Sequence, residues 1–174
     1  MISADYPIEA LALLLDEGCL SERYAPLIAY KDALLSSLPR WGCRVKSDAE
    51  KLPDAALAEI GLSDAQMIRL FRRFLAMYEP KAQKFREIDT LSVSPEERAA
   101  FRELYHLPGV KAIRAALYYR SGYRTLRDFA EAGVEEVLAR TALTISREQL
   151  ACIVPLPKEV RTQIAVARAF TMEY

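Results

Sequence analysis

The stretch between Glu103 and Asp128 contains five basic residues and no acidic one, in a chain whose net charge is zero. On a helix spanning 110–121, positions 111, 114 and 118 would share one face, because residues three or four apart lie one above the other. Val110, Ile113 and Leu117 are expected to form the core face of the same helix. Cations beside a tyrosine suit the phosphate backbone of a nucleic acid. Alternatively, these charges pair with acidic segments of the chain. The basic residues are Lys111, Arg114, Arg120, Arg124 and Arg127, the tyrosine is Tyr118, and the acidic segments include Glu131, Glu135, Glu136 and the region 5–22.

A tight turn around Gly109 is expected just before this helix. Such a turn exposes backbone N–H groups at the start of the second helix, where they and the helix dipole hold a phosphate oxygen. Glycine lets the backbone approach a phosphate without a Cβ in the way. A purely structural turn is the alternative. The candidate nucleic-acid-binding residues are Gly109, Val110, Lys111, Arg114, Tyr118, Arg120 and Arg124.

The segment Leu104–Arg140 resembles the helix-hairpin-helix family, and it is similar to the C-terminal domain of the bacterial RNA polymerase alpha subunit. The matching residues are Leu107-Pro108-Gly109-Val110 at the hairpin, Ala115 and Leu117 at helical spacing, and the run SGYRTLRDFA from Ser121 to Ala130. The resemblance implies paired helices that contact a DNA backbone, or that serve as a packing unit or protein interface. Family members that bind DNA usually carry Gly-x-Gly. Lys111 replaces the second glycine here and would supply a side-chain contact instead.

We do not expect catalysis. Some helix-hairpin-helix proteins are DNA glycosylases, with a catalytic lysine after the hairpin and an aspartate further on, where this chain has Lys111 and Asp128. Lys111, however, lies in the turn itself, and Asp128 suits the first turn of a short helix. The chain also lacks a second domain to enclose a flipped base and has none of the common hydrolase, Walker or zinc-protease motifs. A non-enzymatic binding protein without cofactor or metal is therefore expected, and a protein–protein adaptor on the same fold is the second hypothesis.

The composition suits a folded protein: the chain has 174 residues, of which 52% are apolar and 28% charged. Zero net charge excludes a global attraction to nucleic acid or to a membrane, so only a local patch could provide one. The longest apolar clusters, such as Ile8–Leu15, are about half as long as a membrane span, and no signal-peptide pattern is present. The chain has an odd number of cysteines, and they are widely spaced: Cys19, Cys43 and Cys152. They are predicted to be buried and reduced, in a cytoplasmic protein.

Helices are predicted throughout, because no segment alternates between apolar and polar residues over the length of a strand. Capping boxes are expected at Ser47–Glu50, Ser63–Gln66, Ser94–Glu97 and Ser146–Gln149. Helix stops are expected at Gly18, Gly42, Gly61 and Gly122. The predicted helices are roughly 7–17, 22–38, 48–52, 54–60, 64–78, 80–88, 95–106, 110–121, 126–132, 134–140, 147–152 and 157–172.

The predicted fold is all-α, with two packed helix-hairpin-helix-like units at 1–79 and 95–174 joined by a connector at 80–94. A shift of 80 residues brings several identical residues into register, which predicts an internal duplication. The coinciding pairs are Leu27 with Leu107, Lys31 with Lys111, Arg40 with Arg120, Gly42 with Gly122, Arg44 with Arg124 and Asp48 with Asp128.

Overall fold

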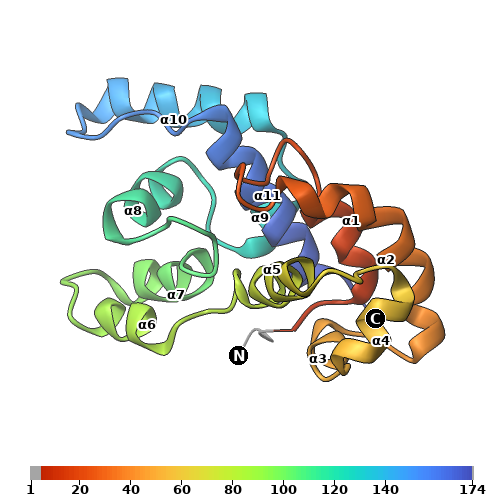
Figure 1. Cartoon of the computed structure of the whole chain (residues 1–174). Coiled ribbons are helices and arrows are strands. Elements are labelled where there is room, and N and C mark those ends of the chain that lie inside the picture. The colour runs from red at the N-terminus through yellow and green to blue at the C-terminus, as the bar shows by residue number, and fades with distance from the viewer. Residues whose placement is uncertain (1–4, 174) are drawn as a thin grey trace.

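Helices make up the regular structure of the described residues, 5–173, in the computed structural model, and the predicted all-α class is confirmed (Figure 1). The one β-type contact in this range is an isolated antiparallel bridge between Pro7 and Val45. None of the described helices is long and apolar enough to cross a membrane.

The first half of the chain folds into short helices around one longer helix. In order they are η1 (Ile8–Ala10), α1 (Leu11–Leu14), η2 (Ala25–Tyr30), α2 (Lys31–Ser37), η3 (Pro39–Trp41), α3 (Lys46–Glu50), α4 (Asp54–Ile60) and α5 (Ala65–Ala76), where η marks a 3-10 helix. Helices this short do not persist alone, so they depend on packing against one another.

The second half contains longer helices. They are α6 (Ala82–Asp89), α7 (Pro95–Leu104), α8 (Ala112–Arg120), α9 (Leu126–Glu131), α10 (Val134–Glu148) and α11 (Pro157–Thr171). Helix α6 occupies most of the predicted connector and buries Ile88.

Of the four predicted capping boxes, only the one at Ser94 caps a helix as expected. The Ser94 hydroxyl accepts the Glu97 N–H at 3.1 Å. Ser47 lies inside α3, whose N-cap is Val45, and Asp64 rather than Ser63 caps α5. These two predictions are wrong because a different residue, Val45 or Asp64, has the extended backbone conformation of the N-cap position.

The predicted separate helix at 147–152 is also wrong, because α10 continues without a break to Glu148. Thr141 and Thr144 donate their hydroxyl protons to the carbonyl oxygens of Val137 and Arg140, one turn earlier, at 2.7 and 2.9 Å. The threonines thus satisfy their hydroxyls within the helix and do not interrupt it. Ser146 therefore lies in the last turn of α10 and does not start a new helix.

Three of the predicted glycine stops are confirmed, and the fourth is wrong. Gly42, Gly61 and Gly122 follow helices and have positive φ values of 82°, 123° and 96°. Helix α1 ends at Leu14, well before Gly18. Gly18 instead allows a close approach, because a Cβ there would lie 2.6 Å from Cδ of Arg161 on α11.

The local geometry repeats at the 80-residue shift seen in the sequence. Asp48 accepts the N–H groups of Arg44 and Val45, and Asp128 accepts those of Arg124 and Thr125, over 2.7–3.2 Å. Helices α3 and α9 begin 80 residues apart, as do α4 and α10. This parallel supports a duplication, but a common origin of the two halves stays a prediction.

The hairpin itself is not repeated. In the second half, Gly109 has a φ of 74° and separates α7 from α8. At the equivalent place in the first half, η2 runs directly into α2 without a glycine. Within residues 5–173, the exposed turn on which a phosphate site would depend is therefore found in the second half alone.

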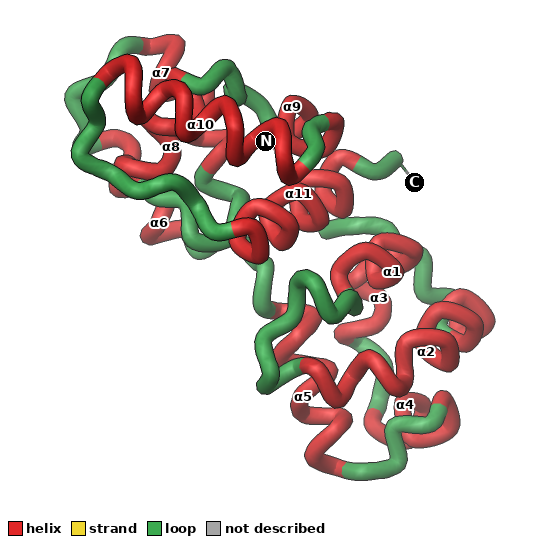
Figure 2. Tube along the Cα trace, turned by 90° about the horizontal axis from the view of Figure 1, so that it is seen from above, coloured by secondary structure: helices red, strands yellow, loops and turns green. Residues whose placement is uncertain are grey.

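Two apolar cores form the interior, and α11 contributes to both. Ala165, Val166 and Ala169 pack with the core of the first half. Val160, Ile164 and Ala167 pack with the core of the second half. Figure 2 shows α11 where the lobe of α1–α5 meets the lobe of α6–α10. The division at 1–79, 80–94 and 95–174 stays a prediction, with α11 tying the two lobes together.

We expect the two cores to unfold together, because α11 contributes buried residues to both. If α11 leaves one core, the other core also loses its contacts with this helix. Phe129→Leu in the second core should cost roughly 1–2 kcal/mol of unfolding free energy. Trp41, the single tryptophan, lies in the first half and reports on that half by fluorescence. The midpoints of urea unfolding by Trp41 fluorescence and by circular dichroism should fall together in this variant. An unchanged fluorescence midpoint would show that the cores are independent.

Candidate nucleic-acid interface

The hairpin between α7 and α8 presents an open backbone turn to solvent. Gly109 is exposed, and no heavy atom lies within 4 Å of where its Cβ would be. Val110 is buried, and its N–H donates to the Leu107 carbonyl at 3.3 Å, which anchors the turn in the core. The turn is thus anchored to the core through Val110 and accessible to solvent at Gly109.

Lys111 is the predicted site residue whose side chain is most available. It is exposed and occupies the N-cap of α8, where its extended backbone leads into a nine-residue helix. It forms no ion pair with any residue in the range 5–173. Its charge therefore lies beside the first-turn N–H groups of α8, a place that favours anions.

The arginines on α8 are held by acidic residues, as the pairing alternative anticipated, although their partners are different ones. Nε of Arg114 lies 3.1 Å from a carboxylate oxygen of Glu159, and its Nη1 donates to the Ile153 carbonyl at 2.9 Å. Its side chain is only 17% exposed. Arg120 pairs with Glu148 at 3.2 Å. Both partners lie on α10 and α11, outside the acidic segments named from the sequence.

The predicted exposed face of α8 is wrong at two positions. Tyr118 is fully buried, whereas Ile113, expected in the core, is 73% exposed. The inward face of the helix instead contains Ala115, Leu117 and Tyr118. Tyr118 can be buried because a polar side chain inside the protein accepts a hydrogen bond from its hydroxyl.

That partner is Gln163 of α11, whose side chain is completely buried. Its Oε1 accepts the Tyr118 hydroxyl at 2.5 Å, and its Nε2 donates to the Pro108 carbonyl at 3.0 Å. Burial raises the pKa of Tyr118 far above its usual range, so the hydroxyl stays protonated as a donor. Gln163 thus fixes both α8 and the hairpin to α11.

Lys84 of α6 holds the other side of the hairpin. Its ammonium donates to the carbonyls of Tyr105 and Leu107 at 2.7 and 3.0 Å. Burial and the neighbouring charge of Lys111 lower its pKa to about 8. The role of Lys84 could not be predicted from the sequence, because its acceptors are backbone carbonyls rather than an acidic residue at a recognisable spacing.

Arg124 and Arg127 lie on the segment after α8, and both are exposed. The Arg124 guanidinium carbon is 4.8 Å from the centroid of the Tyr119 ring, a cation–π contact. The backbone N–H of Arg124 is held by Asp128, which together with Thr125 forms the capping box of α9. Asp128 therefore has the first-turn role predicted from the sequence.

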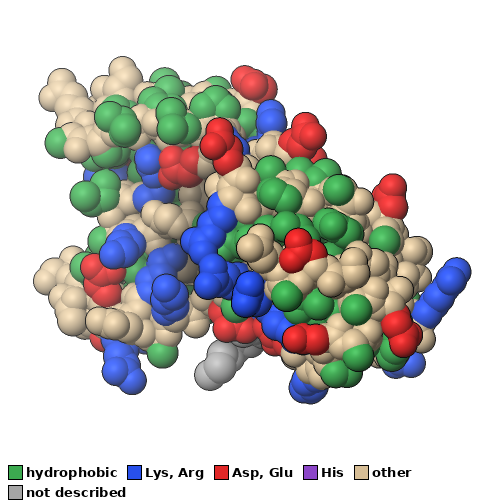
Figure 3. Space-filling model, in the orientation of Figure 1, with side chains coloured by type: hydrophobic (Ala, Val, Ile, Leu, Met, Phe, Trp, Pro, Cys, Tyr) green, Lys and Arg blue, Asp and Glu red, His purple; other side chains and the backbone are tan. Residues whose placement is uncertain are grey.

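Figure 3 shows Lys and Arg side chains gathered in a band across the middle of one face of the molecule. Lys84, Lys111 and the open turn at Gly109 supply positive charge at the hairpin. Among the described residues, no group of three or more His, Cys, Asp or Glu side chains could hold a metal ion.

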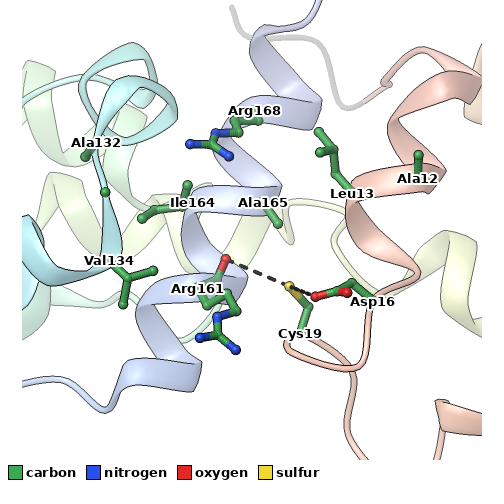
Figure 4. Close-up of a pocket in the computed structure, with 11 residues that line it drawn as sticks. Ala12, Leu13, Asp16, Cys19, Ala132, Val134, Arg161, Ile164, Ala165 and Arg168 are labelled. Carbon is green, nitrogen blue, oxygen red and sulfur yellow. Dashed lines mark hydrogen bonds between the residues drawn. The ribbon is translucent and has the colours of Figure 1, made fainter.

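A cavity of about 310 Å³ lies where α11 meets α1 and the start of α10 (Figure 4). Arg161 and Arg168 line one side, and Asp16 and Cys19 line the other. The Cys19 thiol lies 3.9 Å from an Asp16 carboxylate oxygen and from the Arg161 carbonyl. Burial and the charge of Asp16 raise the pKa of Cys19, so the unreactive thiol form dominates.

The thiols fit the predicted description with one exception. All three cysteines are free, and Cys19 and Cys43 are buried as predicted. Cys152 lies in the loop between α10 and α11 and is only partly buried.

Comparisons of the chain with protein-family models, with curated proteins and with solved structures find no match. The helix-hairpin-helix resemblance therefore rests on the residues of the hairpin and of α8 and α9 alone.

The buried glutamine predicts a clear effect on stability. Gln163→Ala should lower the free energy of unfolding by roughly 2–4 kcal/mol, because it leaves a cavity and removes the acceptor of the buried Tyr118 hydroxyl. The matched control is Gln83→Ala on α6, at an exposed position. It should change stability by less than about 0.5 kcal/mol in the same urea titration. Equal effects of the two variants would contradict the role given to Gln163.

Proposed function

We propose that this chain is a non-enzymatic nucleic-acid-binding protein that contacts the phosphate backbone at the α7–α8 hairpin. The observation that carries the proposal is the exposed turn at Gly109 with Lys111 two residues later, at the start of α8, where it forms no ion pair with the described residues 5–173. Backbone N–H groups, a helix N-terminus and a free ammonium meet there, and each of them favours an anion. We also propose a cytoplasmic location, since the free, widely spaced cysteines suit a reducing compartment.

The proposed roles of the site residues differ accordingly. Gly109 and Lys111 contact the phosphate directly. Val110, Arg114 and Tyr118 position the turn and α8 from inside the protein. Arg120 and Arg124 lie further along the surface and add positive charge near the backbone, with Arg120 partly neutralised by Glu148.

A protein–protein adaptor is the second candidate, and a specific surface favours it. Ile113, Ile153 and Leu156 are 73%, 77% and 67% exposed. The Arg114 bond to the Ile153 carbonyl connects α8 to the loop that contains the other two. Exposed apolar side chains near one another are typical of protein contact sites.

Lys111→Ala tests the hairpin directly. Binding to a 20-base-pair DNA or RNA duplex should become weaker, and the slope of log affinity against log salt should fall by about one, since one phosphate contact is lost. Lys31→Ala is the matched control, because Lys31 takes the equivalent place in the first half, where no hairpin forms. If the wild-type protein binds neither duplex at low salt, the nucleic-acid function fails and the adaptor takes its place.

Lys84 predicts a pH dependence of the same binding. Because its pKa is about 8, Lys84 loses its positive charge between pH 7 and pH 9.5, whereas the phosphates keep their negative charge over this range. Affinity measured by fluorescence anisotropy should therefore fall roughly three- to tenfold over this range. Lys84→Met should bind more weakly at pH 7 and lose most of the pH dependence. The exposed-lysine control Lys51→Met should keep it, and a wild-type affinity that does not change with pH would contradict the prediction.

A further inference from the structure

A second basic surface lies on α5 and on the segment that leads from α5 to α6. Between Ala65 and Arg86 the chain has six basic residues and one acidic residue. The acidic residue, Glu79, is paired with Lys46, and Arg72 is paired with Asp54. The remaining charges of this segment are therefore all positive.

Arg69, Arg73 and Lys81 form what we call the α5 basic face. All three side chains are exposed, and none forms an ion pair within the part of the chain that the structure describes. Arg69 and Arg73 are one helical turn apart, about 6 Å, on the side of α5 opposite its buried residues. Those buried residues are Ile68, Phe71, Phe74 and Leu75.

The α5 basic face is connected to the hairpin through α6. Lys81 is the N-cap of α6, and Lys84 follows one turn later on the same helix. Lys84 in turn donates to the Leu107 carbonyl, two residues before Gly109, and senses the charge of Lys111. Basic residues thus follow the chain from α5 through α6 to the contact with the hairpin, and Figure 3 shows Lys and Arg side chains gathered in a band across one face of the molecule.

We infer that the α5 basic face and the hairpin bind the phosphate backbone of one nucleic-acid duplex together, so that a single binding site spans both lobes. This inference rests on the proposed function of the hairpin. It adds two or three phosphate contacts from the α5 basic face to the one at Lys111. It also gives a role to Arg69 and Arg73, which form no ion pair among residues 5–173, whereas Arg114 and Arg120 of α8 are partly neutralised by Glu159 and Glu148.

The test compares two triple variants that remove the same charge. Arg69→Ala, Arg73→Ala and Lys81→Ala together remove the α5 basic face. Arg40→Ala, Lys51→Ala and Arg147→Ala together remove three exposed cations elsewhere. All six positions are exposed, so both proteins should keep the wild-type thermal midpoint within a few degrees.

With a 20-base-pair DNA duplex, the α5 triple variant should lower the log–log salt slope by two to three, and the control should lower it by less than one. The reduction in slope caused by the α5 triple variant should add to the reduction caused by Lys111→Ala. The wild-type protein should bind one duplex per chain. If Lys111→Ala lowers the slope but the α5 triple does not, this inference is wrong and the hairpin proposal stands. If the α5 triple acts and Lys111→Ala does not, the shared site is overturned together with the hairpin proposal. Two duplexes per chain, or no binding by the wild type, would also overturn the shared site.

Discussion

Helix α11 must satisfy two apolar cores at once, and the arrangement of the other elements depends on it. A helix with one core buries one stripe, but α11 buries residues around most of its circumference. Small side chains make this possible, since Ala165, Ala167 and Ala169 let neighbouring helices approach closely from several sides. The same helix carries Gln163, whose hydrogen bonds hold the hairpin. The geometry of the proposed phosphate site is therefore set by the packing between the two lobes.

The distribution of ion pairs divides the basic residues into two groups. Arg114 and Arg120 neutralise acidic residues of α11 and α10 and strengthen the contacts of α8. Lys111 and the three residues of the α5 basic face form no ion pair among residues 5–173, so their charge stays available to the proposed nucleic-acid ligand. In a chain with no net charge, this separation leaves local groups of cations without a global excess of positive charge. Partly buried pairs such as Arg114–Glu159 are screened by salt less than exposed ones. The internal contacts should therefore persist at salt concentrations that would release the proposed nucleic-acid ligand.

The sequence was sufficient for the fold class and for the features that depend on local backbone chemistry. Gly42, Gly61, Gly109 and Gly122 all have positive φ, and Ser94 and Asp128 cap helices as predicted. These features were accessible because each depends on residues only a few positions apart.

Features set by distant contacts were not accessible from the sequence. The rotation of α8 depends on Gln163, 45 residues after Tyr118. Ile113 was assigned to the core because helical periodicity cannot say which of two neighbouring apolar stripes finds a partner. Lys84 was missed because nothing in its neighbours reveals that it will meet two carbonyls of the hairpin. Local rules therefore identified the turn, and long-range packing decided which side chains around it face solvent.

The shared helix also has a consequence for the order of events during synthesis. The first core needs Ala165, Val166 and Ala169, which leave the ribosome about 90 residues after Tyr78, the last residue that the first half gives to that core. Until then its apolar surface faces water, although domains commonly fold as soon as they emerge. We therefore expect the first lobe to complete its core only when α11 docks. During that interval the nascent chain should expose the apolar side chains of the first core, and a pause in translation before Pro157 would prolong this exposure.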